Sequence, residues 1–262
     1  MEKTCDVIDY YQSSDNELSR RYLHDKFPEL NAKYFQAALE HRYGLYPHIL
    51  NVAEFDNFSG KDVLEVGVGQ GADHYMFAKN GARMSGVDLT LKHCEITELF
   101  LKTFNLYSDI RNANACELPF VDESFDHVYS CGVLLLIERI DLAIDEIWRV
   151  LRSGGTSTIM LYNKRSIHYW LKTRLYYGWA LQEDHYFGKA TVDDWYTDGI
   201  GYPRVWHYQP SDLPKLFKKF ASITYQIACL DPTQLPLFSI PAALHKRLES
   251  NFGFFLWIKV QK

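Results

Sequence analysis

The chain has 262 residues, which is enough for one large domain or for a core with a lid. Its net charge of −5 excludes the overall basic field that would attract nucleic acid or an acidic membrane. The five cysteines are scattered and form no C-x-x-C pair, which fits a reducing compartment and argues against a disulfide framework or a zinc site.

The first residues and the lengths of the apolar runs predict a cytoplasmic protein. The first six residues show no basic segment followed by an apolar one, and no apolar run approaches ~18 residues. We therefore expect no signal peptide and no membrane span. The histidines are dispersed and no carboxylates cluster at ligand spacing, so we expect no metal site. A homodimer is left open.

Residues 1–58 are predicted to form a helical N-terminal arm. Apolar residues recur at helical spacing over 33–41, with a break expected at Gly44 and a new helix near Pro47. The arm either packs on the sheet as a structural element or covers the mouth of a ligand site as a lid. In the second case the arm residues that would contact a substrate are Tyr43, Tyr46 and His48.

The stretch 62–73 organises the rest of the chain. A short apolar run, Val63 to Val66, predicts a buried strand, and three glycines at alternate positions follow before a helical pattern begins. Glycine has no Cβ, so the backbone can turn tightly there and lie against a ligand. A strand, a glycine turn and a helix start in this order indicate a nucleotide-type site at the edge of a parallel sheet.

Strand and helix patterns alternate from residue 62 to residue 161. This alternation predicts a parallel sheet with right-handed crossovers and helices on both faces, whose ligands lie beyond the carboxyl ends of the strands. Strands are expected at 63–66, 83–88, 109–113, 124–135 (with its exit) and 156–161, and helices at 73–80, 90–104 and 141–151, the last ended by Gly154 and Gly155. Further elements are a helix at 211–220, a turn-rich stretch at 231–241, and strands at 222–230 and 252–260.

Two acidic residues, Asp88 and Glu65, favour one kind of adenosine ligand over another. Asp88 ends the second strand, 21 positions after Gly67, where it can accept hydrogen bonds from both hydroxyls of an adenosine ribose, although a lone aspartate there is usually a helix cap. Glu65 stands two positions before the first glycine, where it would repel the pyrophosphate of a dinucleotide and attract a cationic amino group. S-adenosylmethionine carries such a group and no phosphate, so the loop favours it over NAD.

Four motifs, in order, resemble those of the class I S-adenosylmethionine-dependent methyltransferases. Residues 63–71 (VLEVGVGQG) resemble motif I of that family, and residues 86–88 resemble its ribose-binding motif. Residues 114–136 and 146–155 resemble the ubiquinone/menaquinone-biosynthesis kind, the methyltransferase type 11 domain. The resemblance covers about residues 60–161.

This resemblance implies a Rossmann-like α/β fold, a doubly wound, mostly parallel seven-stranded sheet with an antiparallel last strand at 252–260. It implies S-adenosyl-L-methionine as cofactor and S-adenosyl-L-homocysteine as product. Asp88 would bind the ribose, Glu65 would lie near the amino group of the methionine, and Asn114, where the family commonly has aspartate, would accept from the adenine amine. The expected cofactor-binding residues are Glu65, Gly67, Gly69, Gly71, Asp88, Leu89, Asn114, Ala115 and Cys131.

Residues 162–210 interrupt the alternation and carry four of the six tryptophans. An aromatic insertion of this length forms either a lid or the wall of a substrate pocket. We therefore divide the chain into an arm (1–58), a cofactor-binding core (59–161), a substrate-pocket insertion (162–210) and a C-terminal completion of the sheet (211–262). A histidine or tyrosine in such a segment is more often core or rim than catalytic. The catalytic candidates are Tyr162, His168 and His207, and Tyr208 is a further candidate substrate contact.

We predict an S-adenosylmethionine-dependent methyltransferase that acts on an O, N or C nucleophile of a small, partly apolar or aromatic molecule. Catalysis would come mainly from alignment of donor and acceptor. The alternative is a protein with this fold that transfers no methyl group and binds a ligand or serves as a scaffold. The intact glycines and Asp88 favour the first reading. No nucleic-acid partner is expected, because the chain has no basic stripe.

Overall fold

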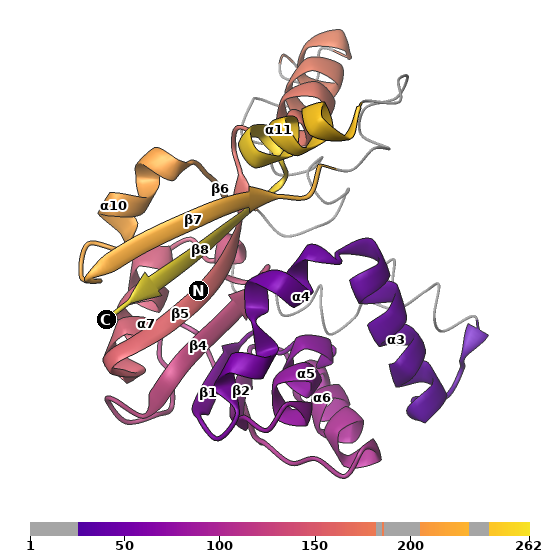
Figure 1. Cartoon of the computed structure of the whole chain (residues 1–262), viewed down its shortest axis with the longest axis vertical. Helices are drawn as coiled ribbons and strands as arrows, with labels where there is room; N and C mark the ends of the chain where they lie inside the picture. The colour runs from indigo at the N-terminus through magenta and orange to yellow at the C-terminus, as the bar shows by residue number, and fades with distance from the viewer. Residues whose placement is uncertain (1–25, 182–184, 186–204, 231–240) are drawn as a thin grey trace.

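A sheet with strand order β3-β2-β1-β4-β5-β8-β7 runs through a computed structural model that describes residues 26–181, 185, 205–230 and 241–262 (Figure 1). All neighbouring strands pair in parallel except β8, which is antiparallel to both β5 and β7. The predicted sheet, with its antiparallel last strand, is thereby confirmed. The strands span Asp109–Asn112 (β3), Arg83–Asp88 (β2), Asp62–Val66 (β1), Phe125–Cys131 (β4), Leu151–Asn163 (β5), Phe255–Gln261 (β8) and Ser222–Ala228 (β7). An additional two-residue strand, β6 (His207–Tyr208), pairs with the end of β5.

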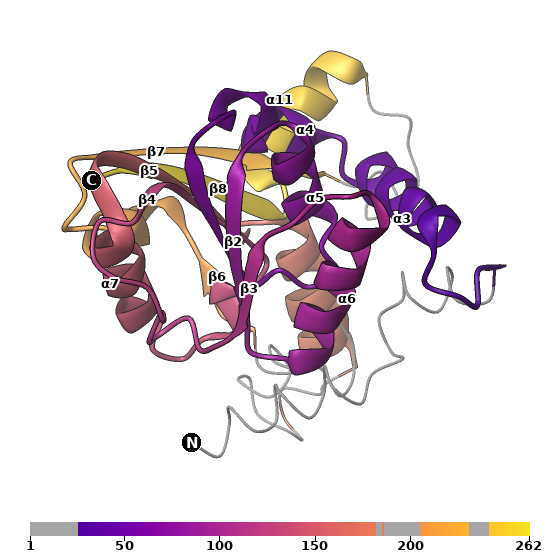
Figure 2. The same ribbon diagram turned by 90° about the horizontal axis from the view of Figure 1, so that it is seen from below.

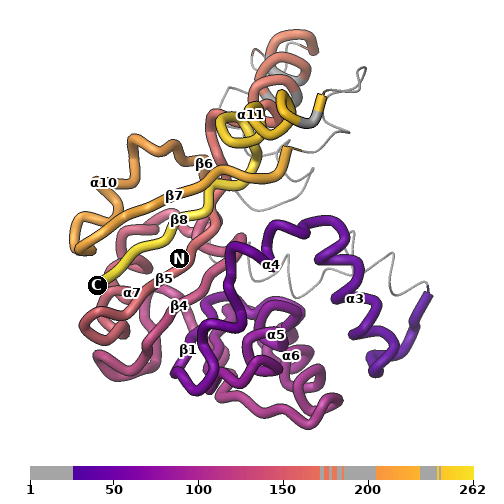
Figure 3. Tube along the Cα trace, viewed as in Figure 1, coloured from indigo at the N-terminus to yellow at the C-terminus, as the bar shows by residue number. Residues whose placement is uncertain are grey.

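Helices cover both faces of this sheet. Helices α5 (Ala72–Lys79) and α6 (Leu91–Thr103) lie on one face, and α7 (Ile140–Val150) lies on the other (Figure 2). The arm forms α3 (Ala32–Leu45) and α4 (His48–Ala53), which lead into β1 on the face of α5 (Figure 3). The remaining elements are α10 (Leu213–Leu216), α11 (Ala242–Phe252), the 3₁₀ turns η1 (Phe55–Phe58), η2 (Leu134–Leu136) and η4 (Pro210–Asp212), and the π-helix η3 (His168–Ala180).

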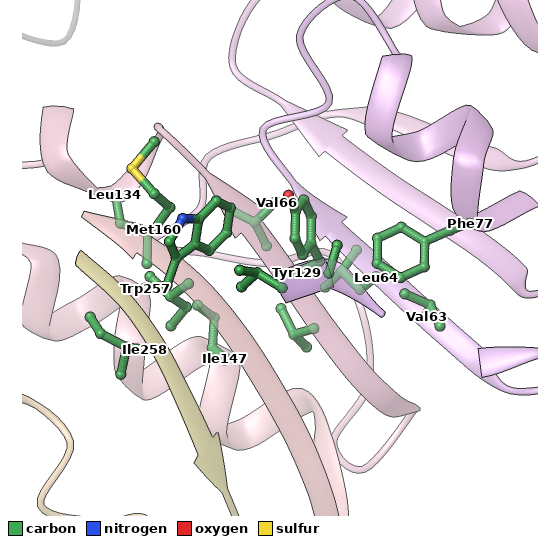
Figure 4. Packing of buried hydrophobic residues seen from close by; sticks show 14 of the residues in the cluster. Val63, Leu64, Val66, Phe77, Tyr129, Leu134, Ile147, Met160, Trp257 and Ile258 are labelled. Atoms are coloured by element: carbon green, nitrogen blue, oxygen red, sulfur yellow. The ribbon is translucent and has the colours of Figure 1, made fainter. Parts of the chain in front are cut away.

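The core is apolar and aromatic on both faces of the sheet. Tyr129 of β4 and Trp257 of β8 are fully buried, and the Tyr129 ring also packs 5.2 Å from that of Phe77 (Figure 4). Ile147 of α7 is buried as well. This burial holds the carboxyl ends of β1, β4 and β5 side by side. No helix of the described residues is both long and apolar enough to cross a bilayer.

Two glycine-based predictions were wrong. The expected break at Gly44 does not occur, because α3 continues to Leu45; this glycine lies in the last turn, where its lack of a side chain is tolerated. Gly154 and Gly155 do not end a helix, since α7 stops at Val150 and β5 begins at the next residue. Gly154 has φ +77° inside β5, where the register with β4 shifts, so these glycines form a strand irregularity.

Two helices were not predicted. The π-helix η3 occupies the first part of the aromatic insertion, and α11 follows the turn-rich stretch. Residues 1–25 of the arm, most of residues 182–204 of the insertion, and positions 231–240 of the turn-rich stretch lie outside the described residues.

Candidate active site

The three glycines after β1 all have positive φ, but their surroundings differ. A Cβ on Gly67 (φ +84°) would lie 2.0 Å from Cγ2 of Val133, and one on Gly71 (φ +81°) would lie 2.9 Å from Oγ1 of Thr97. A Cβ on Gly69 (φ +52°) would meet nothing within 4 Å. Gly67 and Gly71 are therefore required by packing as well as by the backbone, whereas Gly69 borders open space in which a ligand can lie.

Asp88 joins the ends of two neighbouring strands. Its Oδ2 accepts a hydrogen bond from the Gly69 N–H at 3.0 Å, and its Oδ1 accepts one from the Thr90 N–H at 2.9 Å. Nδ1 of His93 lies 3.3 Å from the same Oδ1. Because a carboxylate has about four acceptor positions, Asp88 keeps capacity for ligand hydroxyls while it holds the glycine turn.

Glu65 points into the protein and is paired there. Its Oε2 lies 2.9 Å from Nδ1 of His74. The Ser108 hydroxyl donates to the Met84 carbonyl at 2.7 Å, so its oxygen is left to accept from Nε2 of His74 at 2.8 Å, and Nδ1 then accepts from Glu65. Burial lowers the pKa of His74 to about 3, and burial together with Asp73 raises the pKa of Glu65 well above its usual range. The role of Glu65 at a cofactor stays a prediction.

The charged carboxylate of this region is Asp73, which the sequence reasoning missed. It lies buried in the first turn of α5 and accepts hydrogen bonds from Nε of Arg42 at 2.7 Å and from the hydroxyls of Tyr43 and Tyr129, each at 2.9 Å. Burial alone would raise the pKa of Asp73, but Arg42 and the two hydroxyls outweigh it and lower that pKa. Nη2 of Arg42 also donates to Sγ of Cys131 at 3.5 Å, so the arm is tied to the carboxyl ends of the core strands. The only sequence signal was a carboxylate directly after the glycine turn.

The remaining predicted cofactor contacts lie on the loops after β2 and β3 and at the last residue of β4. Leu89 follows Asp88 directly, and Ala115 is buried. Asn114 is exposed, and its Oδ1 accepts from the Cys116 N–H at 2.9 Å, which leaves its amide nitrogen and one lone pair for a ligand. Burial raises the pKa of Cys131 to about 12, so this side chain is a neutral thiol.

Aromatic residues gather beyond the carboxyl end of β5, around Phe254 and Phe255. The Tyr162 ring lies 4.2 Å from that of Phe254, and the His168 ring lies 4.7 Å from it. Phe255 is 5.3 Å from Tyr46 and 5.6 Å from His48. We call this set the aromatic cluster; its members are Tyr46, His48, Tyr162, His168, Tyr169, His207, Phe254 and Phe255.

The aromatic cluster brings together five of the seven residues predicted to be catalytic or to contact a substrate. His207 enters it through Tyr162 and Tyr169, and burial lowers its pKa to about 4, so its imidazole is neutral at neutral pH. Tyr43 lies outside the aromatic cluster, where its hydroxyl donates to Asp73 of helix α5. Tyr208, the strand neighbour of His207, points to the opposite face of the sheet.

The aromatic cluster and the glycine turn belong to one region. The His48 ring lies 6.1 Å from that of Trp257, which in turn lies 6.3 Å from that of Tyr129. The Tyr129 hydroxyl donates to Asp73 beside the glycine turn. The aromatic cluster and the glycine turn are therefore connected through contacts of the buried side chains of Trp257, Tyr129 and Asp73.

This strand order, with a glycine turn after β1 and an aspartate ending β2, is the arrangement expected of a class I, S-adenosylmethionine-dependent methyltransferase domain. Residues 64–159 match the Methyltransferase domain family, so this part of the chain belongs to it. Over 98 residues the chain is 33% identical to the demethylmenaquinone methyltransferase of Tropheryma whipplei (strain Twist), an alignment that covers 37% of this chain and 40% of that protein. The chain thus spans about two fifths of the length of that curated relative.

Solved structures share the fold over a longer range. A SAM-dependent methyltransferase of Thermotoga maritima is 19% identical, with a TM-score of 0.55 over 92% of this chain and 98% of that one. The [4+2]-cyclase SpnF is 17% identical, with a TM-score of 0.53 over 81% of this chain and 79% of that one. At these identities the likeness concerns the fold alone.

The residues present fit S-adenosylmethionine. Asp88 has acceptor capacity for ribose hydroxyls, and Gly69 borders the open space in which the ligand would lie. S-adenosylmethionine is accordingly the cofactor of this domain. Among the described residues, no three or more His, Cys, Asp or Glu side chains come together in a way that could hold a metal ion.

Proposed function

We propose that the chain transfers a methyl group from S-adenosylmethionine to an O, N or C nucleophile of a small, partly apolar or aromatic molecule. The observation that carries the proposal is Asp88, whose carboxylate holds the glycine turn through Gly69 and keeps acceptor capacity beside open space. When bound, the cofactor supplies an electrophilic methyl group. The protein then has to align an acceptor with it and exclude water.

The aromatic cluster is our proposed acceptor pocket. Its rings come from the arm (1–58), from the insertion (162–210) and from the C-terminal part (211–262), around the cofactor-binding core (59–161). Aromatic faces suit both a flat acceptor and the cationic sulfonium. His207 is the proposed proton acceptor where the nucleophile arrives protonated, because its imidazole is neutral above about pH 4. Tyr162 and His168 would position the acceptor.

The binding test is calorimetry with S-adenosylmethionine and S-adenosylhomocysteine. Wild type is expected to bind both, and Asp88→Ala is expected to lose at least tenfold in affinity because a charged acceptor of two hydroxyl groups disappears. Asp88→Asn keeps one acceptor oxygen, so its affinity should lie between those of wild type and Asp88→Ala. The matched control is Asp122→Ala. It removes an exposed carboxylate that pairs with Arg149, and it should bind S-adenosylmethionine as tightly as wild type does. Absence of binding by folded wild type would contradict the proposal.

One finding favours a second candidate function. The fold is shared with a cyclase, so a site of this shape is compatible with chemistry other than methyl transfer. Binding of S-adenosylmethionine without release of S-adenosylhomocysteine in the presence of phenol, amine and quinol acceptors would favour that alternative. Tighter binding of NAD than of S-adenosylmethionine would instead indicate a dehydrogenase.

We also infer a cytoplasmic location and no nucleic-acid partner. The first inference rests on the scattered cysteines, and the second rests on the net charge of −5. Homodimer formation is a further proposal, which light scattering on the purified chain would test.

A further inference from the structure

The exposed apolar side chains of this molecule are concentrated in one short segment. Six large apolar residues within 170–181 are exposed, and Trp179 is the most exposed of them, at 74%. Elsewhere in the described residues such side chains are scattered, which is ordinary for a protein surface. The exposed six are Trp170, Leu171, Leu175, Tyr176, Trp179 and Leu181.

The π-helical geometry brings three of these residues into line on η3. In a π-helix the hydrogen bonds run from residue i to residue i+5, as between the Tyr176 carbonyl and the Leu181 N–H at 3.0 Å. Residues about four to five positions apart are therefore neighbours, which aligns Trp170, Leu175 and Trp179. Tyr169 lies on the other side of the helix, where it is buried in the aromatic cluster.

A hollow extends this face toward α11. It has a volume of about 450 Å³ and is lined almost entirely by apolar atoms; its lining residues are Arg165, Ser166, Ile167, Trp170, Leu171 and Phe252. Phe252, the last residue of α11, thus lines the same hollow as Trp170 and Leu171 of η3. We call the six exposed residues of η3 and its C-terminal end, with Phe252, the apolar face.

Among the described residues that border the apolar face, cations outnumber anions. Lys164 and Arg165, which come shortly before η3, are both exposed. Helix α11 adds Lys246 and Arg247, both exposed, while Glu249 of the same helix already accepts from the Cys229 N–H at 3.0 Å. This local excess contrasts with the net charge of −5 of the whole chain, so an attraction to anions would be confined to this end.

We propose that η3 and the end of α11 bind the surface of a lipid bilayer with anionic headgroups. Tryptophan and tyrosine favour the boundary between headgroups and acyl chains, leucines enter the acyl region, and lysine and arginine pair with the headgroups. A helix with this composition lies in the interface and does not span it. A protein partner would not require the cations, whereas a bilayer accounts for both the apolar face and its basic border.

The location also links the bilayer to the proposed acceptor pocket. Helix η3 begins at His168, inside the aromatic cluster, and continues directly into the apolar face. An apolar acceptor dissolved in the bilayer would therefore enter next to Tyr162 without crossing water. This last step rests on the proposed function, whereas bilayer binding does not.

Flotation of the full chain with lipid vesicles tests the proposal. The vesicles are phosphatidylcholine alone or phosphatidylcholine with one third phosphatidylglycerol, at 0.1 M and 1 M salt. We expect at least tenfold tighter binding to the anionic vesicles at low salt, a loss of that preference at high salt, and a blue shift of tryptophan fluorescence on binding.

Three variants distinguish the face from its surroundings. Trp170→Ser/Trp179→Ser should weaken binding at least tenfold, and Lys246→Glu/Arg247→Glu should abolish the preference for phosphatidylglycerol. Tyr107→Ser/Val121→Ser removes two equally exposed apolar side chains elsewhere and should leave vesicle binding unchanged. Failure of wild type to float with anionic vesicles, equal loss in all three variants, or a stable dimer that the tryptophan variant dissociates would overturn the proposal. Calorimetry with S-adenosylmethionine on the same variants tests the proposed function separately, because none of these residues borders the glycine turn.

Discussion

Gly67 and Gly69 occupy one turn, yet substitution should affect them differently. In Gly67→Ala the new methyl would collide with Val133 at 2.0 Å, in addition to the strain of a positive φ. Gly69→Ala carries only that strain, about 1–2 kcal/mol, because nothing lies within 4 Å of the new methyl. We therefore expect Gly67→Ala to lower the free energy of unfolding by about 3 kcal/mol or more, whereas Gly69→Ala stays folded and loses affinity for S-adenosylmethionine.

Urea denaturation and calorimetry on the two variants would check this pair. Equal stabilities would mean that Val133 moves aside and that the turn is not held by packing. Unchanged affinity in Gly69→Ala would mean that the ligand does not lie against that backbone.

Single residues were predicted where a local pattern defines them. The glycine turn and Asp88 follow from a strand pattern and a fixed interval, and both stand where expected. The ion pair of Arg42 and Asp73 could not be predicted, because it joins residues 31 positions apart whose contact depends on how the arm packs. The contact between Glu65 and His74 was not predicted either, since only the fold brings these two side chains together.

At the level of elements, the Arg42–Asp73 pair connects helix α3 to helix α5. Asp73 is buried, so Arg42→Met would leave its charge with two hydroxyl donors but no cation and should cost about 3 kcal/mol of unfolding free energy. Asp73→Asn in the Arg42→Met background should recover a large part of this loss. The measurement is a double-mutant cycle by urea denaturation.

The matched control is Arg139→Met, which breaks the exposed pair with Asp141 and should leave stability unchanged within error. Strict additivity of the Arg42 and Asp73 substitutions would contradict the proposed coupling between the two helices.

Elements with strong periodicity were predicted, and those defined by context were not. Helix α7 follows from an apolar pattern with the helical period, and strand β1 follows from a short apolar run before the glycine turn. Gly154 was misread because a positive φ serves a strand irregularity as well as it serves a helix end. Helix η3 has apolar residues on several sides, so no single apolar stripe marked its bounds in the sequence.

At the level of the whole molecule, buried neutral histidines should make stability fall with acid. His127 is buried against Phe58, and burial lowers its pKa to about 3, compared with about 6.5 in an unfolded chain. Between these values the unfolded state binds the proton and the folded state does not. The free energy of unfolding should therefore drop, as pH falls from 6.5 toward 3, by up to about 1.4 kcal/mol per pH unit from this residue alone.

Urea denaturation at pH 7, 6, 5 and 4 measures that slope. His127→Phe should reduce this slope by the contribution of about one proton, whatever the substitution does to stability at pH 7. Thr156→Val removes the hydroxyl that lies 2.8 Å from Nδ1 of His127 but keeps the imidazole. This variant should shift the plot of unfolding free energy against pH and preserve its slope. An unchanged slope in His127→Phe would show that this histidine is not buried in its neutral form.

The position of β8 has a consequence for how the chain is made. This strand lies between β5 and β7 although it follows both in the sequence, as the yellow arrow in Figure 1 shows. On the ribosome β7 therefore emerges with no partner, and the edge of β5 stays open until Phe255–Gln261 has been synthesised. Such long-range pairings form late and slowly, and open strand edges are the places where nascent chains associate with one another. Aggregation during synthesis should accordingly be greatest for chains that stop between Ala228 and Phe255.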